Sequence, residues 1–429
     1  MNRILRWETL SKLERTAALE RPSAKTSDEV FASVRATMDA VQTTGDEAVR
    51  ELTKRFDHVD ITDLQAPAGK PVDPTLRTSL ENAIDRIERF HRQTGFHTTR
   101  IETARGVTCT RVVRPLRRVG LYIPGGTAPL LSTAMMVGVP ARLAGCKEII
   151  LCTPPRADGT VDDSILAVAE LLGISKVFRI GGAQAIAAMA YGTESVPRCQ
   201  KVFGPGNQYV TAAKQLIALH SGTAIDLPAG PSELLVIADS GANPAFIAAD
   251  LLSQAEHGND SQVVLISDSE AMLQAVLAEV DAQLATLPRK EVATQALAAA
   301  RFILTDSIDT ALVISNVYAP EHLSLAVADA PRWFERVEAA GSVFLGDYAG
   351  EAFGDYGSGP NHVLPTGGWA RSMSGVSVAS FQTTITAQSG GQDAYAPLVT
   401  DTVRLARAEG LEGHARAALI REGSTWKRA

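Results

Sequence analysis

A carboxylate and an imidazole are adjacent in the segment NVYAPEHLSL, where Glu321 and His322 follow Pro320. Both side chains can transfer protons near neutral pH, so the pair is a candidate catalytic acid and base. Neighbouring side chains of a regular strand point to opposite faces, and the two can enter one pocket only if the backbone there is irregular. The alternative interpretation is a pair of polar surface residues.

Candidate metal ligands occur in two other segments. In SQAEHG, Gln254 and His257 are three positions apart near the end of an expected helix, which puts both side chains on one face. His257 could instead be a C-terminal helix residue that interacts with the helix dipole. Residues 354–366 are rich in Gly, Pro and Asn and are expected to form an ordered loop, in which Asp355 could ligate a metal or cap a turn. His362 is equally ambiguous.

Two further segments carry polar residues that could contact a ligand. Ser232 precedes the expected strand ELLVIAD, at the kind of strand-edge loop where α/β proteins hold ligands, although a turn-capping hydroxyl explains it equally well. In EGLEGH, Glu409 and His414 are five positions apart and could face one ligand. The alternative is a helix capped by Gly410 and followed by an exposed histidine.

Glycine-rich loops lie at three points where a strand or a helix is expected to end or begin. They are YIPGGTAPL, IGGAQAIAA and FGPGNQYV, and they contain Tyr122, Gln184 and Asn207. Such loops could admit phosphates. None of them is the GxGxxG dinucleotide fingerprint, so the residues alone give only a weak signal for NAD.

The composition excludes several classes of protein. Of the 429 residues, 45% are apolar and 21% are charged, as in ordinary folded proteins, and the net charge is −7 with no long basic run, which argues against nucleic-acid binding. The N-terminus lacks a signal-peptide core, and the most apolar stretch, residues 130–146, is interrupted by Pro140 and Arg142. The four cysteines show no metal or disulfide spacing, so we expect reduced thiols in a cytoplasmic protein.

The apolar pattern predicts the elements that position these residues. Residues 27–95 show helical spacing, so at least two amphipathic helices open the chain. From Arg118, and again from Glu233, short β-rich runs alternate with helical segments, which predicts parallel βαβ units in two α/β domains. A polar stretch and a final helical run from residue 375 onward predict an appended small domain or arm.

Taken together, these segments resemble the histidinol dehydrogenase family along essentially the whole chain. The segments that occur here in the order of that family are RVGLYIPGG, GGAQAIAA, FGPGN, PAGPSE, SQAEH, APEHL, AFGDYGSGPNHVLPT and EGLEGH. Several are long and unusual in composition, so their combined occurrence by chance is negligible.

The resemblance implies a two-step, NAD-linked oxidation of L-histidinol through L-histidinaldehyde to L-histidine, the last steps of histidine biosynthesis. It implies one zinc ion per subunit, bound by Gln254, His257, Asp355 and His414, a set of nitrogen and oxygen ligands that suits zinc. These ligands would also contact the substrate, together with Ser232, His322 and Glu409.

By the same resemblance, His322 is the base that takes the alcohol proton while hydride leaves for NAD. Glu321 would activate the water that attacks the bound aldehyde before the second hydride transfer. The residues implied for NAD binding are Tyr122, Gln184 and Asn207. Zinc would orient the substrate and transfer no electrons.

The implied fold is α/β, with two incomplete Rossmann-like domains and small N- and C-terminal segments in an intertwined homodimer. Boundaries are expected near residues 121, 232 and 377. The segments are then an N-terminal arm (1–22), a main α/β domain with the zinc and catalytic residues (23–121 and 233–377), a second α/β domain that binds NAD (122–232) and a C-terminal segment that completes the partner's active site (378–429).

Two other functions compete with this one. A zinc-dependent hydrolase could use the same metal set, with a Glu and a His beside it, to activate water directly. A protein that binds an imidazole or a nucleotide without catalysis would not need the Glu321 and His322 pair. Formation of NADH from an amino alcohol distinguishes the dehydrogenase from both.

Overall fold

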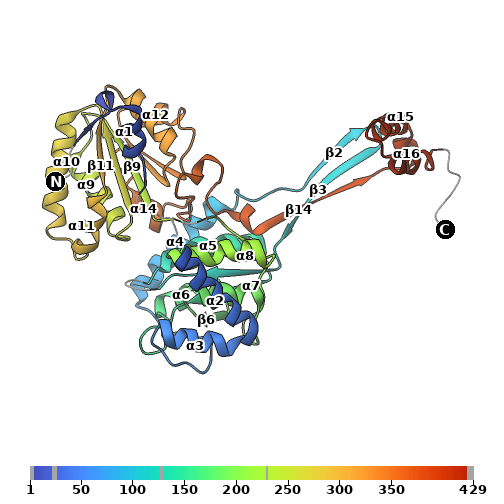
Figure 1. Ribbon diagram of the computed structural model, residues 1–429, viewed down its shortest axis with the longest axis horizontal. Coiled ribbons are helices and arrows are strands. Elements are labelled where there is room, and N and C mark those ends of the chain that lie inside the picture. The colour runs from blue at the N-terminus through green and yellow to red at the C-terminus, as the bar shows by residue number, and fades with distance from the viewer. Residues whose placement is uncertain (1–3, 22–26, 126–128, 229, 423–429) are drawn as a thin grey trace. The chain divides into compact units, whose positions relative to one another are not determined.

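The structure is a computed structural model that describes residues 4–21, 27–125, 129–228 and 230–422 (Figure 1). These residues have an α/β fold with parallel sheets, as the alternation of strands and helices predicts. The chain divides into two compact units. The first comprises Met1–Thr94 and Leu116–Phe381, and the second comprises Gly95–Pro115 and Gln382–Ala429.

The larger sheet of the first unit has six parallel strands within the described ranges. Their order is β1 (Leu5–Arg6), β11 (Arg301–Leu304), β10 (Gln262–Ser267), β9 (Glu233–Ala238), β12 (His322–Ala326) and β13 (Ser342–Leu345). Strands β9 and β10 are buried along their whole length, and their sequences are the nearly continuous apolar runs expected of a parallel sheet that is covered on both faces.

Helices cover both faces of this sheet (Figure 1). One face packs against α9 (Pro244–Ala255), α10 (Glu270–Leu284) and α11 (Lys290–Ala298). The other packs against α12 (Ile308–Tyr318) and α13 (Ala330–Phe334), and the segment that follows α1 (Lys12–Ala18) joins that core through Leu19. The short helix α14 (Glu351–Tyr356) contacts α9, and 3₁₀ helices lie at Trp7–Thr9, Trp369–Arg371 and Val378–Phe381.

The smaller sheet of the first unit has five parallel strands among the described residues. Their order is β6 (Lys176–Arg179), β5 (Glu148–Thr153), β4 (Arg118–Tyr122), β7 (Lys201–Phe203) and β8 (Ala224–Ile225). One face packs against α2 (Asp28–Thr44), α3 (Asp46–Phe56), α7 (Gly182–Tyr191) and α8 (Gln208–His220). The other packs against α4 (Pro74–His91), α5 (Leu131–Ala144) and α6 (Asp163–Leu171).

From the sequence, residues 23–121 are expected to form one domain with residues 233–377. The N-terminal helices pack elsewhere in the structure. Val34 of α2 and Val49 of α3 lie in one core with β5 and α7, and Ile87 of α4 lies in the core on the opposite face of the same sheet. These helices therefore cover the smaller sheet. Helical spacing identifies the apolar face of a helix but not the sheet that this face will cover.

Both sheets have the same strand order when their strands are counted along the chain. It is third, second, first, fourth and fifth: β11, β10, β9, β12, β13 in the larger sheet, with β1 added at its edge, and β6, β5, β4, β7, β8 in the smaller. Ligands of such sheets commonly bind beyond the carboxyl ends of the strands, where the order reverses. In the smaller sheet this reversal lies between β4 and β7.

The second unit is a three-stranded antiparallel sheet followed by two helices (Figure 1). In it β14 (Gln382–Ser389) pairs with β3 (Val107–Pro115), which also pairs with β2 (Thr99–Ala104). The helices α15 (Gln392–Ala408) and α16 (Glu412–Leu419) share a small core. The sequence pattern predicts the final helical run but not this sheet, because β3 and β14 are far apart in the chain. None of the described helices combines the length and apolar composition that crossing a membrane requires.

A buried ion pair holds the loop that follows β7. Gly204 has a φ of 122°, and a Cβ at this position would lie 2.0 Å from the carbonyl oxygen of Tyr122. Its carbonyl accepts a hydrogen bond from Nζ of Lys214 (2.9 Å), and its N–H donates to Oδ2 of Asp226 (2.8 Å). Lys214 and Asp226 also pair with each other, with side chains 2% and 1% exposed. The pair therefore fixes the backbone that leads to Asn207.

Replacement of Lys214 by Met should destabilise the protein by about 3–5 kcal/mol, because Asp226 would stay buried without its cation. The double variant Lys214→Met/Asp226→Leu should recover part of this loss, and denaturant-induced unfolding measures both. A suitable control is Lys54→Met, which breaks an exposed pair with Asp60 and should leave the unfolding midpoint unchanged. An equal shift in the control and in Lys214→Met would contradict the prediction.

Candidate active site

An irregular backbone brings Glu321 and His322 into one cavity. Helix α12 ends at Tyr318, and the next residue, Ala319, has a left-handed conformation with a φ of 54°. Pro320 and Glu321 follow before β12 begins at His322. Both Glu321 and His322 line a cavity of about 560 Å³, as the acid and base interpretation requires. Both are also 5% exposed, so the alternative of two polar surface residues is wrong.

One residue of β9 holds both side chains. The N–H of Glu233 donates to Oε2 of Glu321 (2.8 Å), and its carbonyl oxygen lies 3.2 Å from Nδ1 of His322. A carbonyl oxygen can only accept a hydrogen bond, so Nδ1 carries the hydrogen and Nε2 is left unprotonated in the neutral ring. Oε2 of Glu321 is 3.7 Å from Nδ1.

The side chain of Glu233 is itself anchored. Arg21 donates to both carboxylate oxygens, at 2.5 and 2.9 Å, and the N–H of Gly367 donates to Oε1 at 2.8 Å. The guanidinium of Arg21 also lies 3.9 Å from the centre of the Tyr318 ring. These contacts fix the start of β9, and with it the two groups that Glu233 holds.

Burial shifts the pKa values of this pair in opposite directions. It raises the pKa of Glu321 well above the usual value, and the hydrogen bond from Glu233 offsets this only in part. It lowers the pKa of His322 to about 4. The ring is therefore neutral near pH 7 and can accept a proton.

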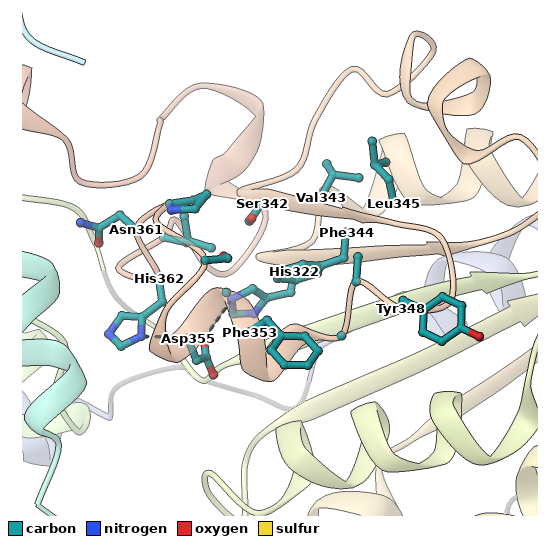
Figure 2. Close-up of a pocket in the computed structure, with 16 residues that line it drawn as sticks. His322, Ser342, Val343, Phe344, Leu345, Tyr348, Phe353, Asp355, Asn361 and His362 are labelled. Carbon is teal, nitrogen blue, oxygen red and sulfur yellow. Dashed lines mark ion pairs between the residues drawn. The ribbon is translucent and has the colours of Figure 1, made fainter. Parts of the chain in front are cut away.

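Asp355 lies among three imidazoles. Its carboxylate is 3.8 Å from Nδ1 of His362 and 4.0 Å from Nε2 of His322 (Figure 2). It is also 3.8 Å from Nε2 of His257. Burial acts to raise the pKa of Asp355, but the contact with His257 and the charges of His362 and His322 outweigh it and lower that pKa. A carboxylate surrounded by nitrogen ligands is suited to share a cation with them.

Gln254 adds an unusual amide to this group. It lies in α9, and His257 follows two residues after the helix ends, so the expected position near a helix end is confirmed. Gln254 is 0% exposed, and neither its Oε1 nor its Nε2 has a hydrogen-bond partner. An unpaired buried amide is costly, so these atoms fit a ligand that completes the site. Within the described part of the chain, no three His, Cys, Asp or Glu side chains form a metal set by themselves.

The cavity of about 560 Å³ joins residues from both sheets of the first unit. It is lined on one side by the loop after β7, including Asn207, and on the other by Ser232, Gln254, His257 and Asp355. A second pocket of about 320 Å³ shares His322, Asp355 and His362 and extends over β13 and α14 (Figure 2). Both pockets therefore meet at the same imidazoles.

One expectation about local structure is wrong. Residues 354–366 were expected to be a loop throughout, but Asp355 lies in α14, because the helix begins at Glu351, before the glycine-rich part of the segment. Ser232 directly precedes β9, as expected, and therefore lies at the amino edge of the larger sheet. Like Glu321, it lines the cavity from that edge.

The residues expected to bind the cofactor belong to the smaller sheet. Tyr122 ends β4, and its hydroxyl accepts a hydrogen bond from the N–H of Gly182 (3.1 Å). Gln184, in the first turn of α7, is buried, and its Nε2 is 3.5 Å from Oδ2 of Asp57. Asn207 caps α8 through the N–H groups of residues 209 and 210 and lines the large cavity. Tyr122 and Gln184 line neither pocket.

Glu409 and His414 lie in the second unit. Glu409 follows α15, His414 lies in α16, and both are exposed. The first unit brings together the other predicted ligands, Gln254, His257 and Asp355. Sequence reasoning missed Glu351 and the structural role of Glu233. Glu351 is four positions before Asp355, a spacing that would have indicated a shared helix face if the helix had been expected.

Known proteins match this chain over nearly its full length. The sequence profile of the family described as histidinol dehydrogenase matches residues 19–422. A histidinol dehydrogenase of Xanthomonas euvesicatoria pv. vesicatoria (strain 85-10) is 54% identical over 427 residues, which are 98% of this chain and 99% of that protein. One of Yersinia pestis is 46% identical and covers 98% and 96%. The crystal structure of histidinol dehydrogenase from Elizabethkingia anophelis has a TM-score of 0.92 at 45% identity, with 96% of each chain covered.

Proposed function

This chain belongs to the histidinol dehydrogenase family, and from that premise we propose that it oxidises L-histidinol through L-histidinaldehyde to L-histidine, with NAD as hydride acceptor. The observation that carries the proposal is the buried pair Glu321 and His322 beside Asp355 in one cavity. Oxidation of an alcohol and hydration of an aldehyde are different steps, and each needs a group that takes a proton.

Four residues would hold one zinc ion per subunit: Gln254, His257, Asp355 and His414. The unpaired amide of Gln254 and the imidazoles within 4.0 Å of Asp355 fit such a group. When bound, zinc would orient the amine and imidazole of the substrate and polarise its hydroxyl. His322, which carries its hydrogen on Nδ1, would take the hydroxyl proton at Nε2.

Glu321 would activate water for the second oxidation. Its raised pKa makes the carboxylate a stronger base than an exposed glutamate, which suits removal of a proton from the water that attacks the aldehyde. Ser232 and Glu409 would contact the substrate together with His322 and the metal ligands. The same cavity would thus retain the aldehyde between the two oxidations.

NAD would bind at the carboxyl edge of the smaller sheet through Tyr122, Gln184 and Asn207. The strand order of both sheets is the Rossmann order without its sixth strand, which supports their description as two incomplete Rossmann-like domains. Helix α8 begins beside Asn207, and its positive end would favour the phosphates of the cofactor.

Incubation of the protein with L-histidinol and NAD should produce NADH and L-histidine, which absorbance and chromatography measure. A chelator should abolish the activity, and added zinc should restore it. The variant His322→Asn should lose turnover while it binds as much zinc as the wild type, because His322 is not among the proposed ligands. Turnover of an amide or ester without NAD would support the zinc hydrolase instead.

Substitution of Glu321 by Gln should slow the aldehyde-to-acid step by at least about 100-fold, because hydration of the aldehyde needs this base. The alcohol step does not need it and should slow by less than about tenfold. Each half-reaction is assayed separately, with L-histidinol or L-histidinaldehyde as substrate. The exposed Glu338→Gln is the control and should retain both rates. An equal loss in both steps would rule out this division of roles.

The second unit supports a homodimer with shared sites. Its helices share a core of only a few small and branched residues, while Leu405 and Ile420 are 68% and 76% exposed. Exposed apolar side chains on so small a unit indicate that another surface covers it. We propose that this surface belongs to a second copy of the chain, so that His414 and Glu409 of one chain complete the site of the other.

Mixed dimers test this arrangement. An inactive His322→Asn chain and an inactive His414→Ala chain are combined under conditions that allow subunit exchange. If sites are shared, some mixed dimers contain one intact site, with His322 from one chain and His414 from the other, and NADH formation returns. Mass spectrometry reports the extent of exchange. Complete exchange without recovered activity would show that each chain builds its own site.

A further inference from the structure

The two oxygens nearest to Nδ1 of His322 come from different elements, and both are closer than Oε2 of Glu321 at 3.7 Å. One is the carbonyl oxygen of Glu233 in β9, at 3.2 Å. The other is Oε1 of Glu351, at 3.3 Å. We propose that Glu351 is a positioning residue for the histidine base: its buried carboxyl shares the Nδ1 hydrogen of His322, and so fixes the tautomer and orientation that turn Nε2 toward the substrate. This inference rests on the proposed function, in which His322 is the base.

Glu351 is placed as this role requires. It is the first residue of α14 and is 1% exposed. Its Oε2 accepts a hydrogen bond from the hydroxyl of Ser253 in α9 (3.4 Å). Its Oε1 has no hydrogen-bond partner among the described residues, and within that part of the chain no Lys or Arg forms an ion pair with Glu351. The imidazole of His322 is the group that this oxygen faces.

Glu351 lines neither of the two pockets, although Gly350 and Asp355 line one or both. The carboxyl lies on the Nδ1 side of the His322 ring, whereas Nε2 is the ring atom near Asp355, which lines both pockets. It acts through the imidazole and touches no reacting atom. A carboxylate in this position also offsets the positive charge that the ring acquires when it takes a proton, which the neutral carbonyl of Glu233 does less well.

A purely structural role is the alternative. A carboxylate at a helix N-terminus is stabilised by the helix dipole, and Glu351 could simply secure α14 against α9. Loss of that role would lower stability or disturb Asp355 in the same helix, and would reduce metal binding or raise KM. Loss of the positioning role would lower kcat while stability, metal content and KM stay near their wild-type values.

The test compares Glu351→Gln and Glu351→Asp in the full-length, zinc-loaded protein. Glu351→Gln keeps the shape of the side chain but places an amide beside Nδ1, and we expect kcat with L-histidinol to fall at least about 100-fold. KM and bound zinc should stay within about threefold of wild type. Glu351→Asp retains the carboxyl but draws it back from the ring, so its kcat should lie between those of Glu351→Gln and the wild type.

The matched control is Asp46→Asn. Asp46 is another buried carboxylate that is bonded to a serine hydroxyl, that of Ser195, but it lies at the start of α3 and lines neither pocket. Its substitution should leave kcat unchanged. The inference is overturned if Glu351→Gln retains kcat within about threefold, or if its loss of kcat is matched by loss of zinc.

If Glu351→Gln does not fold, Glu351→Asp decides alone, and a wild-type kcat in that variant would overturn the inference. Failure of the proposed function gives a different result. In that case the wild-type protein does not turn over L-histidinol with NAD, whereas failure of this inference alone leaves an active wild type and an active Glu351→Gln variant.

Discussion

The direction of the parallel strands governs which ligands the central cavity can hold. The cavity is lined by the loop after the carboxyl end of β7 and by residues that precede the amino ends of β9 and β12. Helix α8 therefore begins at the cavity, and α9 ends at it. The positive end of α8 favours an anion beside Asn207, and the negative end of α9 favours a cation beside Gln254 and His257. The two helix ends thus carry partial charges of opposite sign at a single cavity.

The buried carboxyls around His322 are kept at a cost to stability. Glu233 has Arg21 as its partner, but among the described residues Glu321 and Glu351 have no Lys or Arg within ion-pair distance. Burial raises the pKa of both Glu321 and Glu351 well above the usual value. A protein selected for stability alone would replace such groups with apolar residues. Their presence around a neutral imidazole is typical of a site where proton transfer is the function.

Local patterns predicted the elements well and their packing poorly. The alternation of apolar strands and amphipathic helices from residue 118 onward identified the βαβ units, and it is clearest at β9 and β10, which are buried along their whole length. The pairing of β3 with β14 and the packing of the N-terminal helices depend on contacts between distant segments, which periodicity does not encode.

At the site, motifs identified Glu321 and His322, but their entry into one cavity depends on the left-handed Ala319. Glu351 was not predicted because it lies just before residues 354–366, the glycine-rich segment in which Asp355 was identified.

The backbone of Glu233 holds two adjacent residues, Glu321 and His322, in one cavity. Its N–H donates to the carboxyl of Glu321, and its carbonyl oxygen lies beside Nδ1 of His322 where β9 pairs with β12. The two groups are therefore oriented by opposite ends of one residue, with the N–H end holding an acceptor and the carbonyl end holding a donor. Arg21 and the N–H of Gly367 secure the side chain of that residue from behind. Because both side chains contact the backbone of this one residue, a shift at the start of β9 would disturb both of them.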